Sequence, residues 1–141
     1  MKIGIIGVGL MGGSFALDIK VPFPSSVIYG IDNSFENLQK AKEIGLIDFV
    51  ISFNDLHKMD LILVAVPVNH SLSLIPKVLD LVNSNALVFD VGSTKEAICE
   101  LLSNHPKRGN YLAAHPMAGT EFSGPEAAQK GLYVGKTNII C

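Results

Sequence analysis

The sequence predicts an α/β fold built on a doubly wound, mostly parallel β-sheet. Short apolar segments alternate along the chain with segments whose apolar residues recur at helical spacing. The apolar segments carry little polar alternation, which is typical of strands that helices cover on both faces. With 141 residues, of which 48% are hydrophobic and 17% charged, the chain has the size and composition of one globular domain.

The first half of the chain supplies the start of this alternation. The expected elements are a buried strand at 2–7, a helix at 10–20 on the spacing of Leu10, Met11, Ser14 and Leu17, a strand at 27–32, a further helix, and a short strand at 48–51. Asn33 and Glu36 have the offset of a capping box for the second helix, and Gly45 is placed to end it.

The second half continues in the same way. The expected elements are an apolar strand at 60–66, a helix with the stripe Leu72, Ile75, Leu79 and Val82, a strand at 86–91, a helix marked by Ala97, Ile98, Leu101 and Leu102, and strands at 110–115 and 135–141. Pro76 predicts a kink or a late start of its helix, because proline has no N–H to donate. Lys95 is expected to be a solvated residue in the first turn of its helix.

The composition argues against several classes of partner. A formal net charge of −2 gives no basic field for nucleic acid or membrane surfaces. The aliphatic run LILVAV is far too short to span a bilayer. Residues 2–17 superficially match a secretory signal, but their glycines would weaken a signal helix. Cys99 and Cys141 show no metal or redox spacing, so we expect no metal site and a reducing, cytoplasmic location.

The segment GVGLMG, residues 7–12, matches G-x-G-x-x-G between a predicted strand and a predicted helix. In such a turn Gly7 allows the tight bend, Gly9 lets the backbone approach a pyrophosphate, and Gly12 allows close packing of helix on strand. The motif therefore predicts a Rossmann domain, the doubly wound fold that binds dinucleotides.

The neighbouring residues indicate which dinucleotide is bound. The helix start that includes Leu10 and Met11 would offer its N–H groups to the phosphates. Asp32 ends the second strand, where a carboxylate accepts hydrogen bonds from the adenosine ribose, although it could instead serve only as a helix-start residue. Asn33 and Ser34 follow it, with no Lys or Arg to bind a 2′-phosphate. The sequence therefore favours NAD over NADP.

Three further candidates lie at the carboxyl ends of later strands: Pro67, Ser93 and His115. Ligands bind at this edge of an open parallel sheet, so these residues should face the same crevice as the glycine turn. Ser93 also has the offset from Glu96 of a capping box, and a capping role is compatible with a place at the ligand edge.

His115 is the candidate proton acceptor for an NAD-dependent oxidation. Oxidising an alcohol carbon requires a hydride to leave the carbon and a proton to leave the oxygen, and imidazole suits the second task. The alternative is a histidine that caps the strand end or bonds to backbone. His57 and His105 precede their strands and are expected at the opposite edge, whereas His70 begins a helix and could approach the cofactor.

The motifs GVGLMGGS, DVGSTKE and HPMAGTEFSGPEAA together resemble the prephenate dehydrogenase family, which includes arogenate and cyclohexadienyl dehydrogenases. The resemblance implies NAD-dependent oxidative decarboxylation of prephenate to 4-hydroxyphenylpyruvate, in tyrosine biosynthesis. It also implies that His115 and Ser93 contact the ring hydroxyl and that His115 accepts its proton. By the same resemblance, Gly119, Thr120 and Glu121 form the loop beside the substrate.

The resemblance also implies a larger protein. Family members add a C-terminal helical domain that makes the homodimer and supplies a substrate-binding arginine, so residues 1–141 would be the NAD-binding domain alone. Prephenate is a dicarboxylate that arginine would bind well, yet the arginine here, Arg108, precedes the sixth strand and lies at the wrong edge. We therefore expect this chain to bind NAD without a complete active site.

Alternatives remain open at this point. The substrate could be arogenate instead of prephenate. A hydroxyacid dehydrogenase of the 3-hydroxyisobutyrate type would share the glycine motif and the sheet, but it would give the HPMAGTE loop no role. A NAD-sensing binding module without chemistry would bind the cofactor and be insensitive to replacement of His115.

Overall fold

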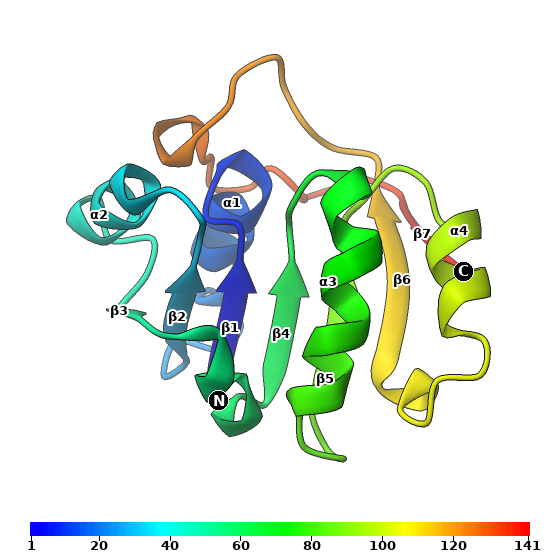
Figure 1. Ribbon diagram of the computed structural model, residues 1–141. Coiled ribbons are helices and arrows are strands. Elements are labelled where there is room, and N and C mark those ends of the chain that lie inside the picture. The colour runs from blue at the N-terminus through cyan, green and yellow to red at the C-terminus, as the bar shows by residue number, and fades with distance from the viewer.

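The computed structural model describes residues 1–141 and confirms the doubly wound sheet (Figure 1). Seven strands form it in the order β3-β2-β1-β4-β5-β6-β7. They are β1 (Lys2–Ile6), β2 (Val27–Ile31), β3 (Phe49–Val50), β4 (Leu61–Val64), β5 (Leu87–Asp90), β6 (Tyr111–Pro116) and β7 (Asn138–Ile140). All neighbours pair in parallel except β6 and β7, which are antiparallel.

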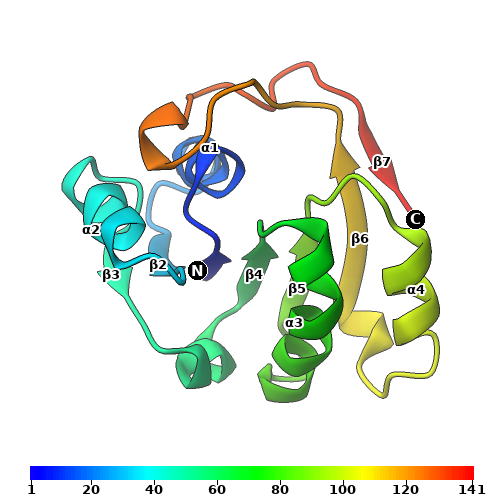
Figure 2. The ribbon, with the colours of Figure 1, turned by 45° about the horizontal axis from the view of Figure 1, so that its top comes forward.

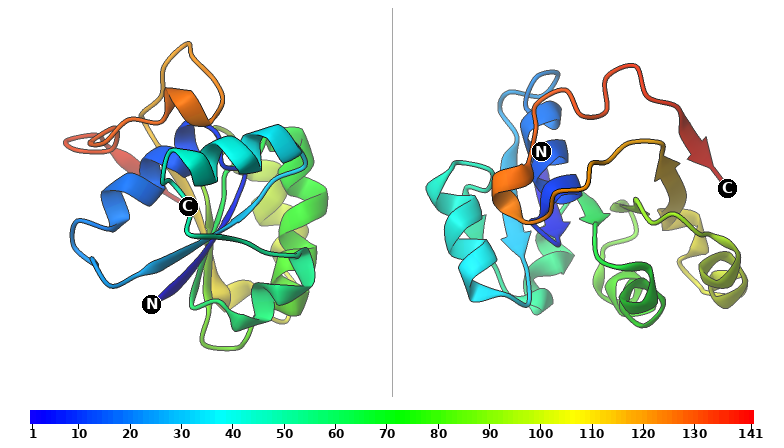
Figure 3. Two further views of the ribbon diagram at one scale, coloured as in Figure 1. Left: turned by 90° about the vertical axis from the view of Figure 1, so that its left-hand side faces the viewer. Right: turned by 90° about the horizontal axis from the view of Figure 1, so that it is seen from above.

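Four α-helices cover the sheet on both faces. They are α1 (Leu10–Ile19), α2 (Phe35–Glu43), α3 (Val68–Leu81) and α4 (Glu96–Leu102), and short 3-10 turns are η1 (Phe53–Lys58), η2 (Arg108–Asn110) and η3 (Pro125–Ala127). In Figure 3, α1 and α2 lie on one face and α3 and α4 on the other. The buried residues form two apolar clusters, as this layering requires. None of the helices combines the length and the apolar character that a membrane-spanning segment requires.

For α2, the prediction for the end of the helix is correct and the prediction for its start is wrong. The residue that caps its start is Ser34, whose Oγ accepts a hydrogen bond from the Asn37 N–H at 3.1 Å, so the predicted capping box of Asn33 and Glu36 is wrong. The end is as predicted: Gly45 adopts a φ of +78°, and the chain turns away from the helix there.

Helix α3 runs through Pro76, so the predicted late start is wrong. The predicted apolar stripe is confirmed, because Ile75, Leu79 and Val82 are fully buried against the sheet. Proline in a helix removes one hydrogen bond. Burial of Ile75, Val78 and Leu79 around Pro76 offsets that cost and keeps the helix continuous.

The turn between β5 and α4 contains a buried charged cluster that the sequence analysis did not foresee. Lys95 is only 9% exposed and forms an ion pair with Asp90, so its predicted place in solvent is wrong. The Tyr111 hydroxyl donates to Asp90 Oδ1 at 2.8 Å, and the Gly92 N–H donates to Asp90 Oδ2 at 3.1 Å. Burial, together with the Asp90 carboxylate, raises the pKa of Tyr111 above its usual range.

Ser93 is exposed in this turn and does not cap α4, which contradicts the predicted capping box with Glu96. Helix α4 starts only at Glu96, with Lys95 as the residue before it. The direction of the turn is set by the buried Lys95 and Asp90 pair, which overrides the local capping preference of serine.

Residues 125–133 cross α1 on the outside of the sheet, and we call this segment the strap (Figure 3, right). The Gln129 N–H donates to the fully buried hydroxyl of Ser14 at 2.9 Å. The Tyr133 hydroxyl donates to the carbonyl of Met11 at 2.7 Å, and Lys40 of α2 pairs with Glu126 at 3.3 Å. The strap therefore ties the last part of the chain to its first helix.

Candidate functional site

The largest cleft, of about 790 Å³, opens at the carboxyl edge of β1, β2 and β4. It lies where the strand order reverses, since β1 has β2 on one side and β4 on the other. Ligands of open α/β sheets bind at such switch points. The predicted cofactor residues that line it are Gly7, Gly9, Leu10, Met11, Asp32 and Pro67.

The glycine turn has the geometry that its motif predicts. Gly7 adopts a φ of +91°, and a Cβ there would lie 2.3 Å from the Ala65 carbonyl oxygen. A Cβ on Gly12 would lie 2.0 Å from the Gly7 carbonyl oxygen, which shows how closely α1 packs on the turn. At Gly9 the nearest atom to such a Cβ is 3.8 Å away. The Gly9 position is therefore less crowded than Gly7 or Gly12, and its neighbour there is backbone with no side chain.

The start of α1 can accept an anion. Gly9 precedes the helix and offers no side-chain cap, and the first turn contains no acidic residue. The N–H groups of Leu10 and Met11 therefore lack an acceptor within the helix, and the helix dipole favours negative charge here. The donor set fits a pyrophosphate in the cleft.

Asp32 lies just beyond the end of β2 and lines the same cleft. Its Oδ2 accepts a hydrogen bond from the Val8 N–H at 3.0 Å, and its Oδ1 accepts one from the Ser34 N–H at 2.9 Å. These bonds orient the carboxylate, and each oxygen keeps a lone pair for a hydroxyl donor. No Lys or Arg lines the cleft, so the residues fit a ribose better than a 2′-phosphate.

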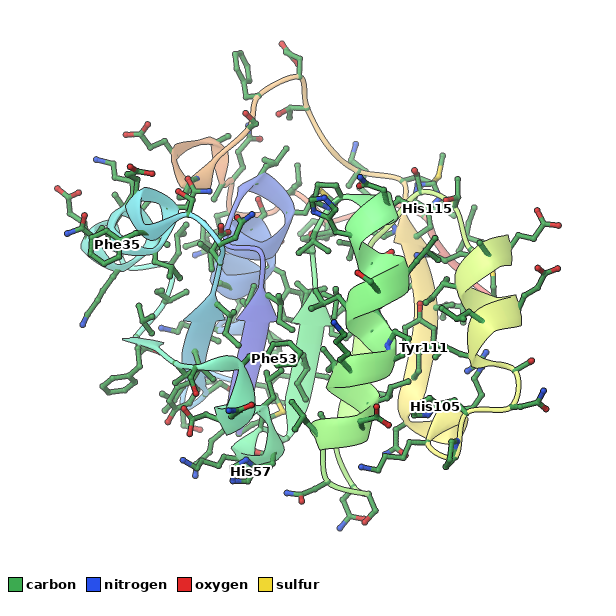
Figure 4. All side chains as sticks on the ribbon, in the orientation of Figure 1. Phe35, Phe53, His57, His105, Tyr111 and His115 are labelled. Atoms are coloured by element: carbon green, nitrogen blue, oxygen red, sulfur yellow. The ribbon has the colours of Figure 1, made fainter.

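A second, shallower hollow of about 360 Å³ lies at the end of β6. It is lined by His115, Gly119 and Thr120, together with Met117, Ala118 and Lys136. His115 is half-buried, and its backbone lies opposite Ile139 of β7. Figure 4 shows His115 at the carboxyl edge, whereas His57 and His105 lie at the opposite end, as predicted.

The structure does not bring every predicted site residue into these two hollows. Ser93 lines neither hollow, although β5 and β6 run in parallel with Asp90 opposite Ala113, so the turn after β5 lies on the same edge as His115. Glu121 is exposed and lines neither hollow. Gly12 is buried behind the turn, where its role is packing.

Several residues that line the main cleft were missed by the sequence analysis. Asn37, Phe53, Phe122, Ser123 and Gly124 all contribute to it. The last three stand in the same segment as the HPMAGTE motif, but only tertiary structure brings them to the glycine turn. His70, which stands in the first turn of α3, lines the cleft too.

The parallel sheet, the glycine turn and the acidic residue at the end of β2 define this chain as a nucleotide-binding domain of the doubly wound α/β class. Comparison with known families identifies it further. The family model described as the nucleotide-binding domain of prephenate dehydrogenase matches residues 15–141. The chain belongs to this family.

Two comparisons with individual proteins agree with this assignment. Prephenate dehydrogenase of Lactococcus lactis is 36% identical over 137 residues, which cover 94% of this chain and 38% of that protein. The crystal structure of Aquifex aeolicus prephenate dehydrogenase in complex with hydroxyphenyl propionate and NAD⁺ superposes with a TM-score of 0.89 at 33% identity. That match covers 99% of this chain and 50% of the other.

A third similar protein is named for a different substrate, arogenate. Arogenate dehydrogenase of Synechocystis is 27% identical, with a TM-score of 0.83, and the match covers 99% of this chain and 49% of that one. The chain thus spans half or less of the length of each of these relatives.

Proposed function

We propose that this chain is the NAD-binding part of a dehydrogenase that converts prephenate to 4-hydroxyphenylpyruvate and carbon dioxide, a step of tyrosine biosynthesis. The observation that carries the proposal is one sheet edge that holds both the Asp32 cleft and His115, in a chain of the prephenate dehydrogenase family. The roles that we propose below for the individual site residues follow from this arrangement.

The cleft residues would bind NAD. The N–H groups of Leu10 and Met11 would hold the pyrophosphate, and the oriented carboxylate of Asp32 would accept the ribose hydroxyls. Pro67 would line the path toward the second hollow. When bound, NAD supplies the hydride acceptor. The NAD⁺ in the Aquifex aeolicus relative supports this choice of nucleotide.

His115 would act as the proton acceptor of the reaction. Its ring lies in the second hollow, beyond the end of the parallel part of β6. There it can take the proton from the ring hydroxyl of a bound substrate, and the Ser93 hydroxyl on the same edge would orient that hydroxyl. Loss of the carboxyl group with aromatisation of the ring makes the overall step favourable.

The loop after β6 would shape the substrate side. Gly119 adopts a φ of +142°, which lets the chain bend close to the hollow, and Thr120 lines it. Glu121 would lie at the entrance. Arg108 is unavailable for the substrate carboxylates, because its guanidinium donates to the Tyr111 carbonyl at 2.8 Å at the opposite end of β6.

A further domain would therefore complete the site. The relatives are at least twice as long as the part of them that this chain matches. We propose that the whole protein adds a helical domain that supplies the carboxylate-binding arginine and forms a homodimer. Residues 1–141 are then its cofactor domain.

The function is tested by following reduced nicotinamide formed from NAD with prephenate, and with arogenate in parallel, in the 141-residue chain and in the whole gene product. We expect activity in the longer protein, with prephenate as the better substrate. A preference for arogenate would favour the function of the Synechocystis relative. NAD binding without turnover of either substrate would contradict the proposal and favour a binding module. Activity on 3-hydroxyisobutyrate would instead favour a hydroxyacid dehydrogenase.

A further inference from the structure

The loop at 117–124 returns from β6 to the glycine turn. Figure 2 shows it crossing from the end of β6 to η3 beside α1. Its last residues, Phe122, Ser123 and Gly124, line the main cleft together with Gly9. The Gly124 nitrogen and Cα are the nearest atoms to a Cβ built on Gly9, at 3.8 and 3.9 Å. The two glycines therefore face each other with no side chain between them.

The strap holds this part of the loop in place. It begins directly after Gly124 and bonds to α1 through the buried Ser14 hydroxyl and the Met11 carbonyl. A Cβ on Gly13 would lie 2.8 Å from the Ala128 Cβ, so the strap packs against the helix backbone. Because the strap is anchored to α1 itself, Ser123 and Gly124 are positioned relative to the start of that helix.

The donors on this side of the cleft have no partners within the protein. The N–H groups of Ser123 and Gly124 and the Ser123 hydroxyl donate no hydrogen bond to any protein acceptor. Ser123 and Gly124 line the same cleft as Leu10 and Met11 at the start of α1, and the Gly124 backbone lies beside Gly9. N–H and hydroxyl donors that share one cleft and have no protein acceptor suit a ligand that presents anionic oxygens to both segments.

We propose that Ser123 and Gly124 form a second wall of the pyrophosphate site, opposite the start of α1. The Ser123 hydroxyl and the two N–H groups bind phosphate oxygens that the helix does not reach. The proposal rests on the dinucleotide cofactor proposed above, and it adds residues outside the glycine motif to the binding of that cofactor.

The test uses the 141-residue chain with Ser123→Ala and three ligands, NAD, ADP-ribose and adenosine, measured by titration calorimetry. Loss of a hydrogen bond to a charged group should weaken NAD and ADP-ribose binding about tenfold. Adenosine has no phosphate, so its affinity should not change. Ser123 is exposed and its hydroxyl has no partner, so the unfolding midpoint should stay the same. The matched control is Ser84→Ala, which removes an exposed hydroxyl at the other end of the molecule and should change nothing.

The outcomes separate this proposal from the proposed function. If the unaltered chain does not bind NAD, the proposed cofactor is wrong. If it binds NAD and Ser123→Ala changes the affinity less than twofold, or weakens adenosine equally, the second wall is wrong and the cofactor assignment stands. NMR provides an independent readout: the amide signals of Ser123 and Gly124 should shift with ADP-ribose and not with adenosine. Unchanged signals with ADP-ribose would overturn the proposal.

Discussion

Asp32 combines a structural and a recognition role at the end of β2. Its carboxylate accepts the N–H groups of Val8 and Ser34, and so joins the glycine turn to the start of α2. In Asp32→Asn, one of these N–H groups would face an amide NH₂. We expect NAD affinity to fall about tenfold. The preference for NAD over NADP should narrow, because a neutral amide no longer repels a 2′-phosphate.

The preference is the ratio of the NAD and NADP affinities, which is measured by titrating the chain and its Asp32→Asn variant with each nucleotide. Asp80→Asn is the control, since it makes the same change of charge at the exposed far end of α3. An unchanged ratio of the NAD and NADP affinities in Asp32→Asn would contradict the assignment of Asp32 to the ribose.

His115 can be tested only where substrate is turned over. In the whole gene product, His115→Asn should lower kcat by about a hundredfold to ten-thousandfold, because an amide cannot accept the hydroxyl proton. Nucleotide affinity should be retained, since His115 lies outside the main cleft. The control is His57→Asn, an exposed histidine at the opposite edge. A loss below threefold in His115→Asn would remove His115 from the reaction.

At the scale of elements, the contact between β1 and α1 depends on Gly12. A Cβ at this position would lie 2.0 Å from the Gly7 carbonyl oxygen and 2.8 Å from Ile5 Cγ2. Gly12→Ala should therefore lower the free energy of unfolding by about 3 kcal/mol, the upper end of the usual cost of overpacking. Gly109→Ala is the control, because nothing lies within 4 Å of its Cβ position. Denaturant unfolding measures the stability of both variants. If Gly12→Ala is as stable as Gly109→Ala, the turn relaxes around the added methyl group and the contact does not depend on Gly12.

The turn between β5 and α4 depends on the ion pair of Lys95 and Asp90. Lys95→Met would leave the Asp90 carboxylate buried without its cation, and we expect a loss of about 3–5 kcal/mol in the free energy of unfolding. Adding Asp90→Asn should restore part of this loss. Lys77→Met, an exposed lysine on α3, should change stability by no more than about 0.5 kcal/mol. A Lys95→Met chain as stable as this control would show that the pair contributes little.

At the scale of the whole molecule, the cofactor should stabilise the fold. The cleft is built from β1, β2, β4 and α1, so unfolding destroys it. At a hundred times its dissociation constant, NAD should add about 2.7 kcal/mol to the free energy of unfolding. The stabilisation is measured by thermal unfolding of the chain under three conditions: without nucleotide, with NAD, and with NADP at the same concentration. Equal stabilisation by the two nucleotides would contradict the preference for NAD.

Much of this architecture could be predicted from the sequence because the signals are local. The buried strands read as continuous apolar runs, as in residues 61–64, and the glycine spacing places a turn between a strand and a helix. Gly45 was correctly expected to end α2, since a positive φ suits glycine. These features are set by residues that are close together along the chain.

The features that were missed depend on contacts between distant residues. Lys95 resembles an ordinary first-turn lysine until Tyr111 and the sheet bury its partner Asp90. Ser34 caps α2 instead of Asn33 because the Asp32 carboxylate already accepts the Ser34 N–H and directs the chain there. Phe122, Ser123 and Gly124 reach the glycine turn only through the strap, which no pattern within that segment reveals.

The strap has a consequence for the order in which the chain is completed. The buried Ser14 hydroxyl meets its partner Gln129 across a separation of 115 residues, and Met11 meets Tyr133 across 122. On the ribosome the chain emerges from its N-terminus, so α1 is made early but gains these two hydrogen bonds only after the strap has been synthesised. The glycine turn at its start is therefore synthesised early, but its surroundings are complete only after residues 125–133 have been made.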